Sequence, residues 1–306
     1  MAVYVLRRLV QMVPVLLGIT LIVFVLLRVS GDPVVLMLPE DASREQVEAL
    51  RRSLGLDRPL PEQYLLFLRD LARGDFGRSI RYGNQDVLGI VLERLPATLE
   101  LAAAAVLVAL LISVPAGVVA ATRRRRWPDH AATTFSVLGE AMPNFWLGIM
   151  LILVFAVNLR LLPVSGRGSL AHLVLPAVTL GTGLAAVLTR LLRSSLIEAL
   201  NQDYVRTAHA KGARPRVVLV KHAMRNALLG YLTVLGLQMA SLLAGSVVTE
   251  QVFAWPGIGL LAVQAINSRD MAVVQAIVIV SSLVVMVANL VVDVLYAVVD
   301  PRIQYS

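Results

Sequence analysis

Residues 194–226 read SSLIEALNQDYVRTAHAKGARPRVVLVKHAMRN, a polar and basic stretch between two long apolar runs. It contains both lysines of the chain, Lys211 and Lys221, and residues 190–225 carry a net charge of +6. Apolar or small side chains recur at every fourth position, namely Leu196, Leu200, Tyr204 and Ala208. This spacing stacks side chains on one face of a helix, so the first half of the stretch is predicted to be helical.

The predicted helix has a start signal and a stop signal. Asn201 or Asp203 is expected to cap a new helix start, and Asp203 is placed to pair with Arg206 one turn later. Gly212 is expected to end the helix, because glycine adopts the left-handed conformation of a helix end at low cost. Pro215 follows at the usual distance and favours the first turn of a second short helix.

Composition indicates a membrane protein. The chain has 306 residues, 58% of them apolar, and no cysteine. Soluble domains are roughly 45–50% apolar, and the excess here lies in long runs. The lack of cysteine excludes disulfides and thiolate metal sites. A net charge of +8 suits nucleic-acid binding, but the basic residues cluster at the ends of apolar runs, which favours a membrane instead.

Six apolar runs are long enough to cross about 30 Å of hydrocarbon. They are residues 9–27, 96–122, 131–159, 173–192, 227–248 and 272–299. A cleaved signal peptide is the competing interpretation of the first run, but the run exceeds the usual apolar core of about 7–15 residues and no small-residue cleavage site follows. The third run contains a break at Met142-Pro143-Asn144. The sequence therefore predicts an all-α membrane protein with six transmembrane helices.

The distribution of charge predicts how these helices are oriented. With the amino terminus inside, the short inner segments carry 15 Lys or Arg and the short outer segments carry 3. Four arginines at 123–126 end the second run, and a stop-transfer anchor beside anionic lipid explains them better than nucleic-acid binding. Both termini are therefore expected in the cytoplasm. On charge alone, residues 194–226 can also be interpreted as a solvated basic loop.

Several motifs favour a more specific interpretation. The runs DYVRTAHAKGA and KHAMRNALL, with VFAWPGIG at 252–259, resemble ABC importer permeases, most closely the inner-membrane subunits that import dipeptides, oligopeptides, glutathione or nickel. The wider superfamily has Glu-Ala-Ala, three residues and then Gly in its cytoplasmic coupling loop. Gly212 and Ala208 match this pattern, whereas Arg206 and Thr207 replace the Glu and the first Ala. Three outer segments resemble the same group, at 31–33, 54–64 and 74–80.

The resemblance implies the type I importer permease fold and several partner chains. Residues 1–95 would form the first helix and an extracytoplasmic segment, and residues 96–306 a five-helix core with the coupling loop at 194–226. The residues implied to couple to an ATPase are Asp203, Tyr204, Arg206, Thr207, Ala208, Lys211 and Gly212. The implied partners are a second homologous permease subunit, two ABC ATPase subunits that bind ATP and Mg²⁺, an extracytoplasmic solute-binding protein and membrane lipid. The implied location is the bacterial or archaeal cell (inner) membrane.

The sequence offers no site for chemistry in this chain itself. No Gly-x-x-x-x-Gly-Lys-Ser/Thr occurs, so ATP is expected to be hydrolysed by another chain. The four histidines lack metal-ligand spacing, and no Ser/His/Asp set lies in one region. We therefore expect no catalytic residue, no metal and no cofactor in this chain, and a lipid-modifying enzyme is disfavoured.

Ionisable groups inside a membrane are costly and often functional. Glu100, Glu140 and Asp293 lie in or near the apolar runs, and Asp293 is close enough to an interface for a helix-end role. Glu140 and Asn144, beside the proline break, are the candidates for lining a pore. A stand-alone secondary carrier is the alternative from another class, but it would show inverted repeats and broken helices around midplane charges, and we find no convincing internal repeat. Whether the solute is a peptide, glutathione or nickel stays open.

Overall fold

The protein, a computed structural model, is described over residues 2–30, 43–53, 55–79 and 81–299. These residues are mostly helical. The β-bridge found among them is isolated and joins Arg78 to Asp86. The predicted all-α class is therefore confirmed. The motif at 31–33, the tail at 300–306, and residues 54 and 80 of the other two outer motifs lie outside the described residues.

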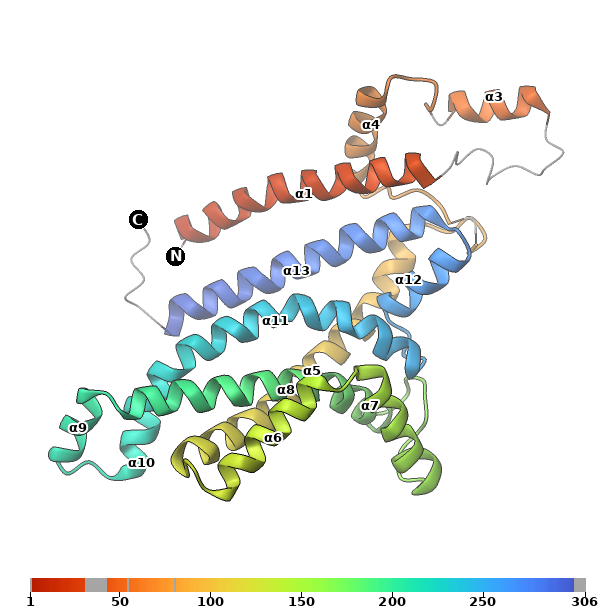
Figure 1. The fold of residues 1–306 in the computed structure, drawn as a ribbon. Coiled ribbons are helices and arrows are strands. Elements are labelled where there is room, and N and C mark those ends of the chain that lie inside the picture. Colours follow the sequence, from red (N-terminus) through yellow and green to blue (C-terminus); the bar gives the residue numbers. More distant parts are fainter. Residues whose placement is uncertain (1, 31–42, 54, 80, 300–306) are drawn as a thin grey trace. The chain divides into compact units, whose positions relative to one another are not determined.

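The helices are labelled in Figure 1. In chain order they are α1 (Ala2–Ser30), α3 (Arg44–Ser53), α4 (Leu60–Ala72), α5 (Val87–Thr122), α6 (Trp127–Ala141), α7 (Asn144–Leu151), the π-helix η1 (Ile152–Asn158), α8 (Leu170–Leu200), α9 (Asp203–Ala210), α10 (Pro215–Val217), the π-helix η2 (Val218–Ala223), α11 (Met224–Val252), α12 (Ile258–Asn267) and α13 (Met271–Val299). Five stretches of the described residues are single helical runs long and apolar enough to span a membrane, namely Leu6–Leu26, Val87–Thr122, Leu170–Leu200, Pro215–Leu243 and Met271–Val292.

The third predicted span is sharply bent. α6 and the following segment of α7 and η1 meet at an angle of 105°. Pro143 has no N–H to continue the helix of α6, and it forces the residue before it into extended backbone. Met142 accordingly has φ −78° and ψ 124°. With this bent pair counted as one span, the six predicted transmembrane helices are all present.

The chain divides into two compact units. The larger consists mainly of Pro96–Leu260 and takes in α13 from Val285 onward, whereas the smaller consists of Leu6–Leu95 and Leu261–Val284. Each of the long helices α5 and α13 therefore contributes one part to each unit.

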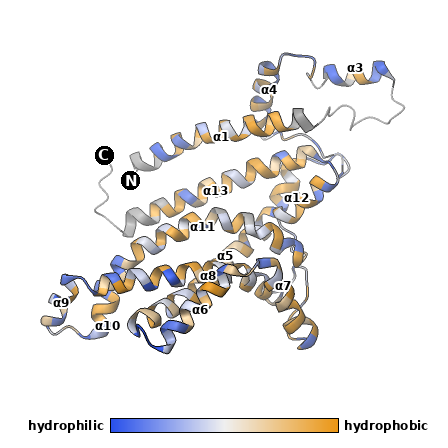
Figure 2. Ribbon diagram, in the orientation of Figure 1, coloured by the Kyte–Doolittle hydropathy of each residue, from blue (hydrophilic) through white to orange (hydrophobic). Residues whose placement is uncertain are grey.

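α8 is the central helix of the larger unit. It packs against α6, α7 and α11, and it runs alongside α11 in Figure 1. Leu188 and Leu192 of α8 are fully buried in a core shared with alanines of α5. A Cβ at Gly181 would lie 2.7 Å from the carbonyl oxygen of Ala105, so glycine is what lets α8 approach α5 this closely. Figure 2 shows apolar residues along α8 and α11, and hydrophilic residues on α9 and at the turn between α5 and α6.

In the smaller unit, aromatic contacts hold α4 against α1. The ring centroid of Phe24 lies 5.4 Å from that of Tyr64 and 5.9 Å from that of Phe67. At the start of α13, the buried carboxylate of Asp270 accepts a hydrogen bond of 2.5 Å from the Ser79 hydroxyl. α4 is thus held against α1, and Ser79 is held to the residue that precedes α13.

Candidate functional site

The helix predicted over the first half of the basic stretch is in fact two helices. A turn at residues 201–202 separates α8 from α9. The turn shifts the helix register, so Val205 and Ala208 are buried and pack against Val218 of η2. Tyr204 is 38% exposed instead. The single face predicted across the turn from four-residue spacing is therefore wrong, because the spacing is interrupted where α8 ends.

The start of α9 also differs from the prediction. Its N-cap residue is Gln202, which makes no capping hydrogen bond through its side chain, so neither Asn201 nor Asp203 occupies the cap position. The predicted pair within α9 is confirmed, since Arg206 Nη1 lies 3.3 Å from Asp203 Oδ1. Both side chains of this pair are largely exposed, so it contributes well below about 1 kcal/mol to the stability of the fold.

Gly212 ends α9 as predicted. Its φ is +76°, in the left-handed region that glycine adopts without strain. The N–H of Gly212 donates to the carbonyl of His209 at 2.9 Å, and the N–H of Ala213 donates to the carbonyl of Ala208 at 3.2 Å. These are the two hydrogen bonds of a Schellman motif, which closes a helix with a glycine just beyond its last residues. The direction in which the chain leaves α9 is therefore set by Gly212.

The predicted short second helix is not a separate element. Pro215 does begin a helix, α10, as expected of proline in a first turn. That helix passes directly through η2 into α11, because no glycine or proline occurs between Pro215 and Gly230 to break it. The residues around Lys221 and His222 form wider π-helical turns within this continuous run. α9 thus lies at the junction between two long helices, α8 and α11.

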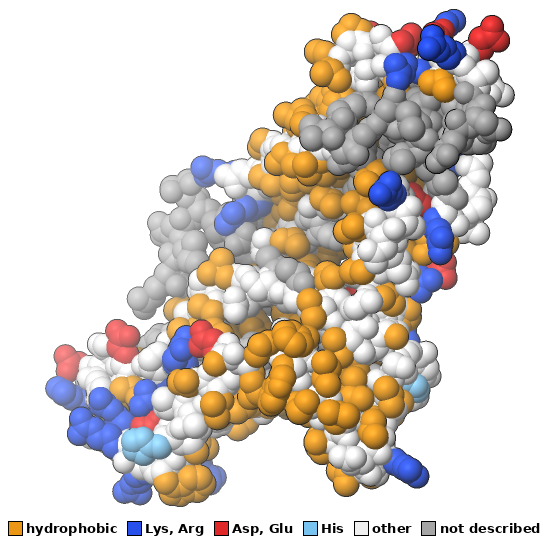
Figure 3. Space-filling view, turned by 45° about the vertical axis from the view of Figure 1, so that its right-hand side comes forward, with side chains coloured by type: hydrophobic (Ala, Val, Ile, Leu, Met, Phe, Trp, Pro, Cys, Tyr) orange, Lys and Arg blue, Asp and Glu red, His pale blue; other side chains and the backbone are white. Residues whose placement is uncertain are grey.

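The residues predicted to couple to an ATPase form one exposed surface on this junction. Asp203, Tyr204, Arg206, Thr207, Lys211 and Gly212 are exposed, whereas Ala208 is buried beneath them. The Thr207 hydroxyl donates to the carbonyl of Asp203 at 2.9 Å. The lower left of Figure 3 shows Lys and Arg side chains gathered with a few acidic ones and a histidine. α9 is therefore a short helix packed on one side and open to a partner on the other.

A partly buried ion pair that sequence reasoning missed lies close to this junction. Asp129, in the first turn of α6, is 3% exposed and accepts a hydrogen bond of 2.9 Å from Arg193 Nη2 as well as one from its Nε. The backbone N–H of Arg125 donates to the same carboxylate at 2.9 Å. A bidentate pair fixes the relative position of its two elements, here α6 and the last part of α8. Both residues flank basic runs, so in the sequence they look like solvated charges.

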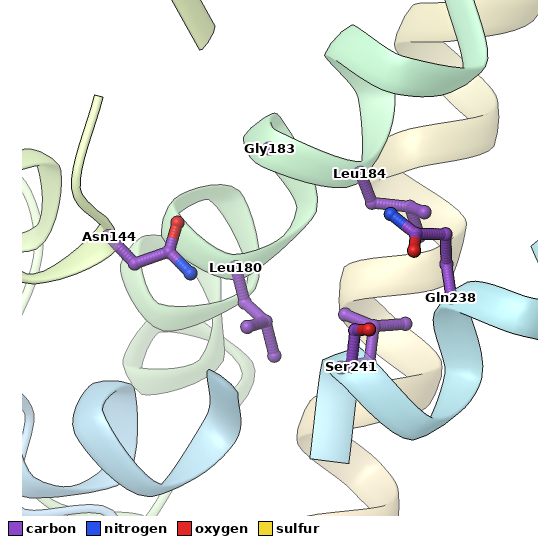
Figure 4. Close-up of a pocket in the computed structure, with 7 residues that line it drawn as sticks. Asn144, Leu180, Gly183, Leu184, Gln238 and Ser241 are labelled. Carbon is purple, nitrogen blue, oxygen red and sulfur yellow. The ribbon is translucent and has the colours of Figure 1, made fainter. Parts of the chain in front are cut away.

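Asn144 lines an open pocket of about 140 Å³ in the larger unit. The pocket is formed by α7, α8 and α11, and Figure 4 shows the side chains of Asn144, Gln238 and Ser241 around it. Leucines of α8 and α11 and Gly183 complete the lining. Gln238 and Ser241 were not predicted as site residues. The signal for them is that both are uncharged polar side chains in an otherwise apolar run.

Glu140 is not among the residues that line this pocket. Its carboxylate pairs with Arg190 of α8, with Oε2 2.6 Å from Nη1, and both side chains are about half exposed. Glu100 likewise pairs with Arg167, at 2.5 Å. The side chain of Asp293 lies outside what the structure describes. Among the described residues, no three His, Asp or Glu side chains gather closely enough to hold a metal ion.

Glu250 is a further residue that sequence reasoning did not single out. It is fully buried near the end of α11, where its carboxylate accepts hydrogen bonds from the Thr98 hydroxyl at 2.7 Å and from the N–H of Leu260 at 2.9 Å. A Cβ at Gly257 or Gly259 would overlap this carboxylate. The two glycines that end the VFAWPGIG motif therefore let the chain wrap closely around Glu250.

The chain matches two protein families that together cover most of its length. Residues 113–305 match the family described as binding-protein-dependent transport system inner membrane component. Residues 1–102 match the N-terminal part of the binding-protein-dependent transport system membrane component. Residues 194–226, the bent pair of α6 and α7, and the pocket lined by Asn144 all lie within the first of these matches.

Similar proteins carry the same kind of description. The chain is 43% identical over 316 residues to the oligopeptide transport system permease protein AppB of Bacillus subtilis, with all of both chains covered. It is 39% identical over 334 residues to the dipeptide transport system permease protein DppB of Alkalihalophilus pseudofirmus, also with full coverage of both. It is 40% identical over 304 residues to the glutathione transport system permease protein GsiC of Escherichia coli K12, with 99% of each chain covered.

Solved structures show the same fold at low sequence identity. An inward-facing structure of the MetNI methionine ABC transporter matches 70% of this chain and 97% of its own chain, with a TM-score of 0.56 and 18% identity. An amino acid ABC transporter with histidines matches with a TM-score of 0.52, covering 70% of this chain and 94% of its own at 15% identity. Taken with the full-length relatives, these matches show that the chain belongs to the family of binding-protein-dependent transport system inner membrane components, the pore-forming permease subunits of bacterial ABC importers.

Proposed function

We propose that this permease serves an importer of peptides or of a peptide-like solute such as glutathione. The observation that carries the proposal is similarity over the full length to oligopeptide, dipeptide and glutathione permeases, at 39–43% identity. The departures of Arg206 and Thr207 from the wider superfamily pattern point in the same direction, since peptide-type permeases resemble this variant of the loop.

We propose that α9 transmits the movement of ATPase partners to the membrane helices. Val205 and Ala208 pack against Val218, and the Schellman motif at Gly212 fixes the chain that leads into α10. A displacement of α9 would therefore be passed to α8 on one side and to α11 on the other. Coupling of this kind needs two states with different contacts, and closure of two ATPase subunits on ATP supplies the difference.

The remaining parts of the importer would be separate chains. A second homologous permease completes the pore, two ABC ATPases bind ATP and Mg²⁺, and an extracytoplasmic binding protein delivers the solute. Because the sequence has no phosphate-binding loop, this chain by itself is expected neither to bind nor to hydrolyse ATP. Asn144 would face the path of the solute. Glu140 would lie near that path, where its carboxylate pairs with Arg190 and both side chains are about half exposed.

The experiment that tests the proposed function is copurification followed by ligand identification. Pulling down this chain from its native membrane should recover a second permease and ATPase subunits. The binding protein of the same system should carry peptides or glutathione when its bound ligand is extracted and measured by mass spectrometry. A binding protein loaded with nickel instead, or a permease that transports alone without ATPase partners, would contradict the proposal.

A further inference from the structure

We propose that the pocket lined by Asn144, Gln238 and Ser241 binds the main-chain amide groups of the transported peptide. This inference rests on the proposed function and adds to it a site where the permease itself contacts the solute. Such a site is separate from any selection made earlier by a binding protein.

The position of the pocket suits a solute path. It opens between α7, which starts directly after the proline break, and the neighbouring helices α8 and α11 (Figure 4). Its volume of about 140 Å³ is room for several water molecules, and so for one peptide unit of a longer chain. Because it is open on one side, a peptide can present one unit to it without being enclosed.

The polar groups of the pocket have no partner within the part of the chain that the structure describes. The side chains of Asn144, Gln238 and Ser241 make no hydrogen bond there. Polar side chains within membrane-spanning helices are normally satisfied by other protein groups, by water or by a ligand, because hydrocarbon supplies no hydrogen bonds. Three such side chains around one opening therefore indicate a surface that faces water or solute.

The chemistry of the lining matches a peptide unit. Each side-chain amide supplies one acceptor and two donor protons, and the hydroxyl supplies both kinds. A peptide unit likewise has one N–H donor and one C=O acceptor. None of the seven lining residues is charged, so a free carboxylate or ammonium would lose hydration there without gaining a counter-charge. Leucines form the rest of the wall and accept side chains of varied type.

The amide of Asn144 lies beside two glycines, at ordinary contact distance from the position of each missing Cβ. A Cβ at Gly183 of α8 would lie 3.6 Å from Asn144 Oδ1, and a Cβ at Gly245 of α11 would lie 3.6 Å from Asn144 Nδ2. The amide therefore lies between the backbones of two neighbouring helices, with one atom toward each. Since Pro143 sets where α7 begins, the proline break itself places this amide at the pocket.

The test compares one peptide with its N-methylated form. Vesicles containing the complete importer are supplied with trialanine, or with trialanine methylated at one main-chain nitrogen, through the same binding protein. The initial uptake rate of trialanine is divided by that of its N-methylated form. This ratio is measured for the wild type and for Asn144→Leu, Gln238→Met and Ser241→Ala. Any preference of the binding protein is common to all variants and cancels. Losing one hydrogen bond should lower the ratio roughly three- to tenfold.

Matched controls separate a site from a general defect. Gln251→Met changes the same residue type at an exposed position of the same helix and should leave the ratio unchanged. Ser241→Thr keeps the hydroxyl and should also keep the ratio. If Asn144→Leu fails to assemble, the other two variants carry the test. Wild-type ratios in the assembled variants, or an equal drop in Gln251→Met, would overturn this inference alone. No uptake of either trialanine or glutathione by the wild type would overturn the proposed function with it, and uptake of glutathione alone moves the comparison to glutathione and its N-methylated form.

Discussion

Arg193 forms a partly buried bidentate ion pair with Asp129, with Nη2 2.9 Å from Oδ2. Arg193 lies in α8 seven residues before that helix ends at Leu200, and Asp129 lies in the first turn of α6. The pair therefore joins the beginning of the bent span to the helix that leads into α9. A movement of α9 transmitted along α8 would reach α6 through this contact.

Replacing only Arg193 should lower the stability of the protein much more than replacing both Arg193 and Asp129. Arg193→Met leaves the Asp129 carboxylate without its counter-charge, which costs about 1–3 kcal/mol because the pair is only partly buried. The double variant Asp129→Asn with Arg193→Gln should recover part of that loss. The unfolding temperature of the purified complex in detergent measures both. Arg190→Gln, which breaks only the half-exposed pair with Glu140, is the control and should cost below about 1 kcal/mol. Strictly additive losses in the double variant would show that the two charges do not stabilise each other.

Replacing Glu250 should destabilise the end of α11. Glu250→Leu removes both acceptors for the Thr98 hydroxyl and the Leu260 N–H, and each donor left buried without a partner costs about 1–3 kcal/mol. Glu250→Gln keeps one acceptor oxygen and should be milder. The amount of folded protein in the membrane and its melting temperature check this. The exposed neighbour Gln251, changed to Leu, serves as the control. Equal stability of Glu250→Leu and wild type would contradict the account of this buried carboxylate.

Much of the fold could be predicted from the sequence because membrane spans are read from length and apolar composition. The proline break in the third span and the glycine end of α9 were predictable too, since both depend on backbone chemistry at single residues. A new helix start at Asn201 or Asp203 was predicted, but the shift of register at 201–202 was not, because Asn201 and Gln202 lack the strong breaking signal of glycine or proline. The continuous helix after Pro215 was predictable but was not predicted, since residues 216–229 contain no glycine or proline to break it.

The candidate site was predictable only where a motif marked it. The exposed surface of α9 was predicted because the run DYVRTAHAKGA resembles ABC importer permeases. Asn144 was predicted as a site residue because it lies beside Pro143. Asp129 depends on a contact between helices far apart in the chain, which no local pattern reports, whereas Gln238 and Ser241 are marked only as polar side chains in an apolar run. The sequence alone therefore locates the pocket by one of its three polar side chains.

Asn144 should be accessible to water during transport. The chain has no cysteine of its own, so Asn144→Cys introduces a single thiol. It should react with a small charged thiol reagent, and Ser241→Cys in the same pocket should react as well. Ala185→Cys, at a fully buried position of α8, is the control and should not react. If Asn144→Cys does not react with the reagent in either the resting or the ATP-driven complex, then Asn144 contributes to helix packing and does not line the solute path.

Reporter fusions should place the two ends of each span on opposite sides of the membrane. Fusions after Arg126 and Lys221 should report the cytoplasm, because positively charged short loops stay inside. Fusions at Leu60 and Gly166 should report the outside. An outside signal at Lys221 would contradict the orientation and would place α9 on the wrong side for ATPase partners.

The proposed coupling role of α9 depends most directly on Gly212. A Cβ at this position would meet no atom within 4 Å, so a substitution there changes the backbone energy without a steric clash. Gly212→Val costs about 1–2 kcal/mol in the left-handed region, and Gly212→Ala should cost less. Coupling between linked sites is typically about 1–3 kcal/mol, so a loss of this size matters for transport more than for assembly.

Gly166 offers a matched control for this measurement. It has φ +89°, and a Cβ there would also meet no atom within 4 Å, but it lies in the predicted outer loop, where its N–H donates to the carbonyl of Phe253. Gly166→Val should therefore carry a similar backbone cost without touching the coupling surface. Both variants should reach the membrane and assemble with their partners in comparable amounts.

Transport and ATP hydrolysis measured side by side, in vesicles with all partner subunits present, test the central claim. For Gly212→Val the account predicts hydrolysis that continues while solute uptake per ATP falls severalfold, with Gly212→Ala in between and Gly166→Val unchanged. If Gly212→Val assembles fully and transports at the wild-type rate per ATP, then residues 194–226 are only a solvated connection and α9 does not couple ATP hydrolysis to transport.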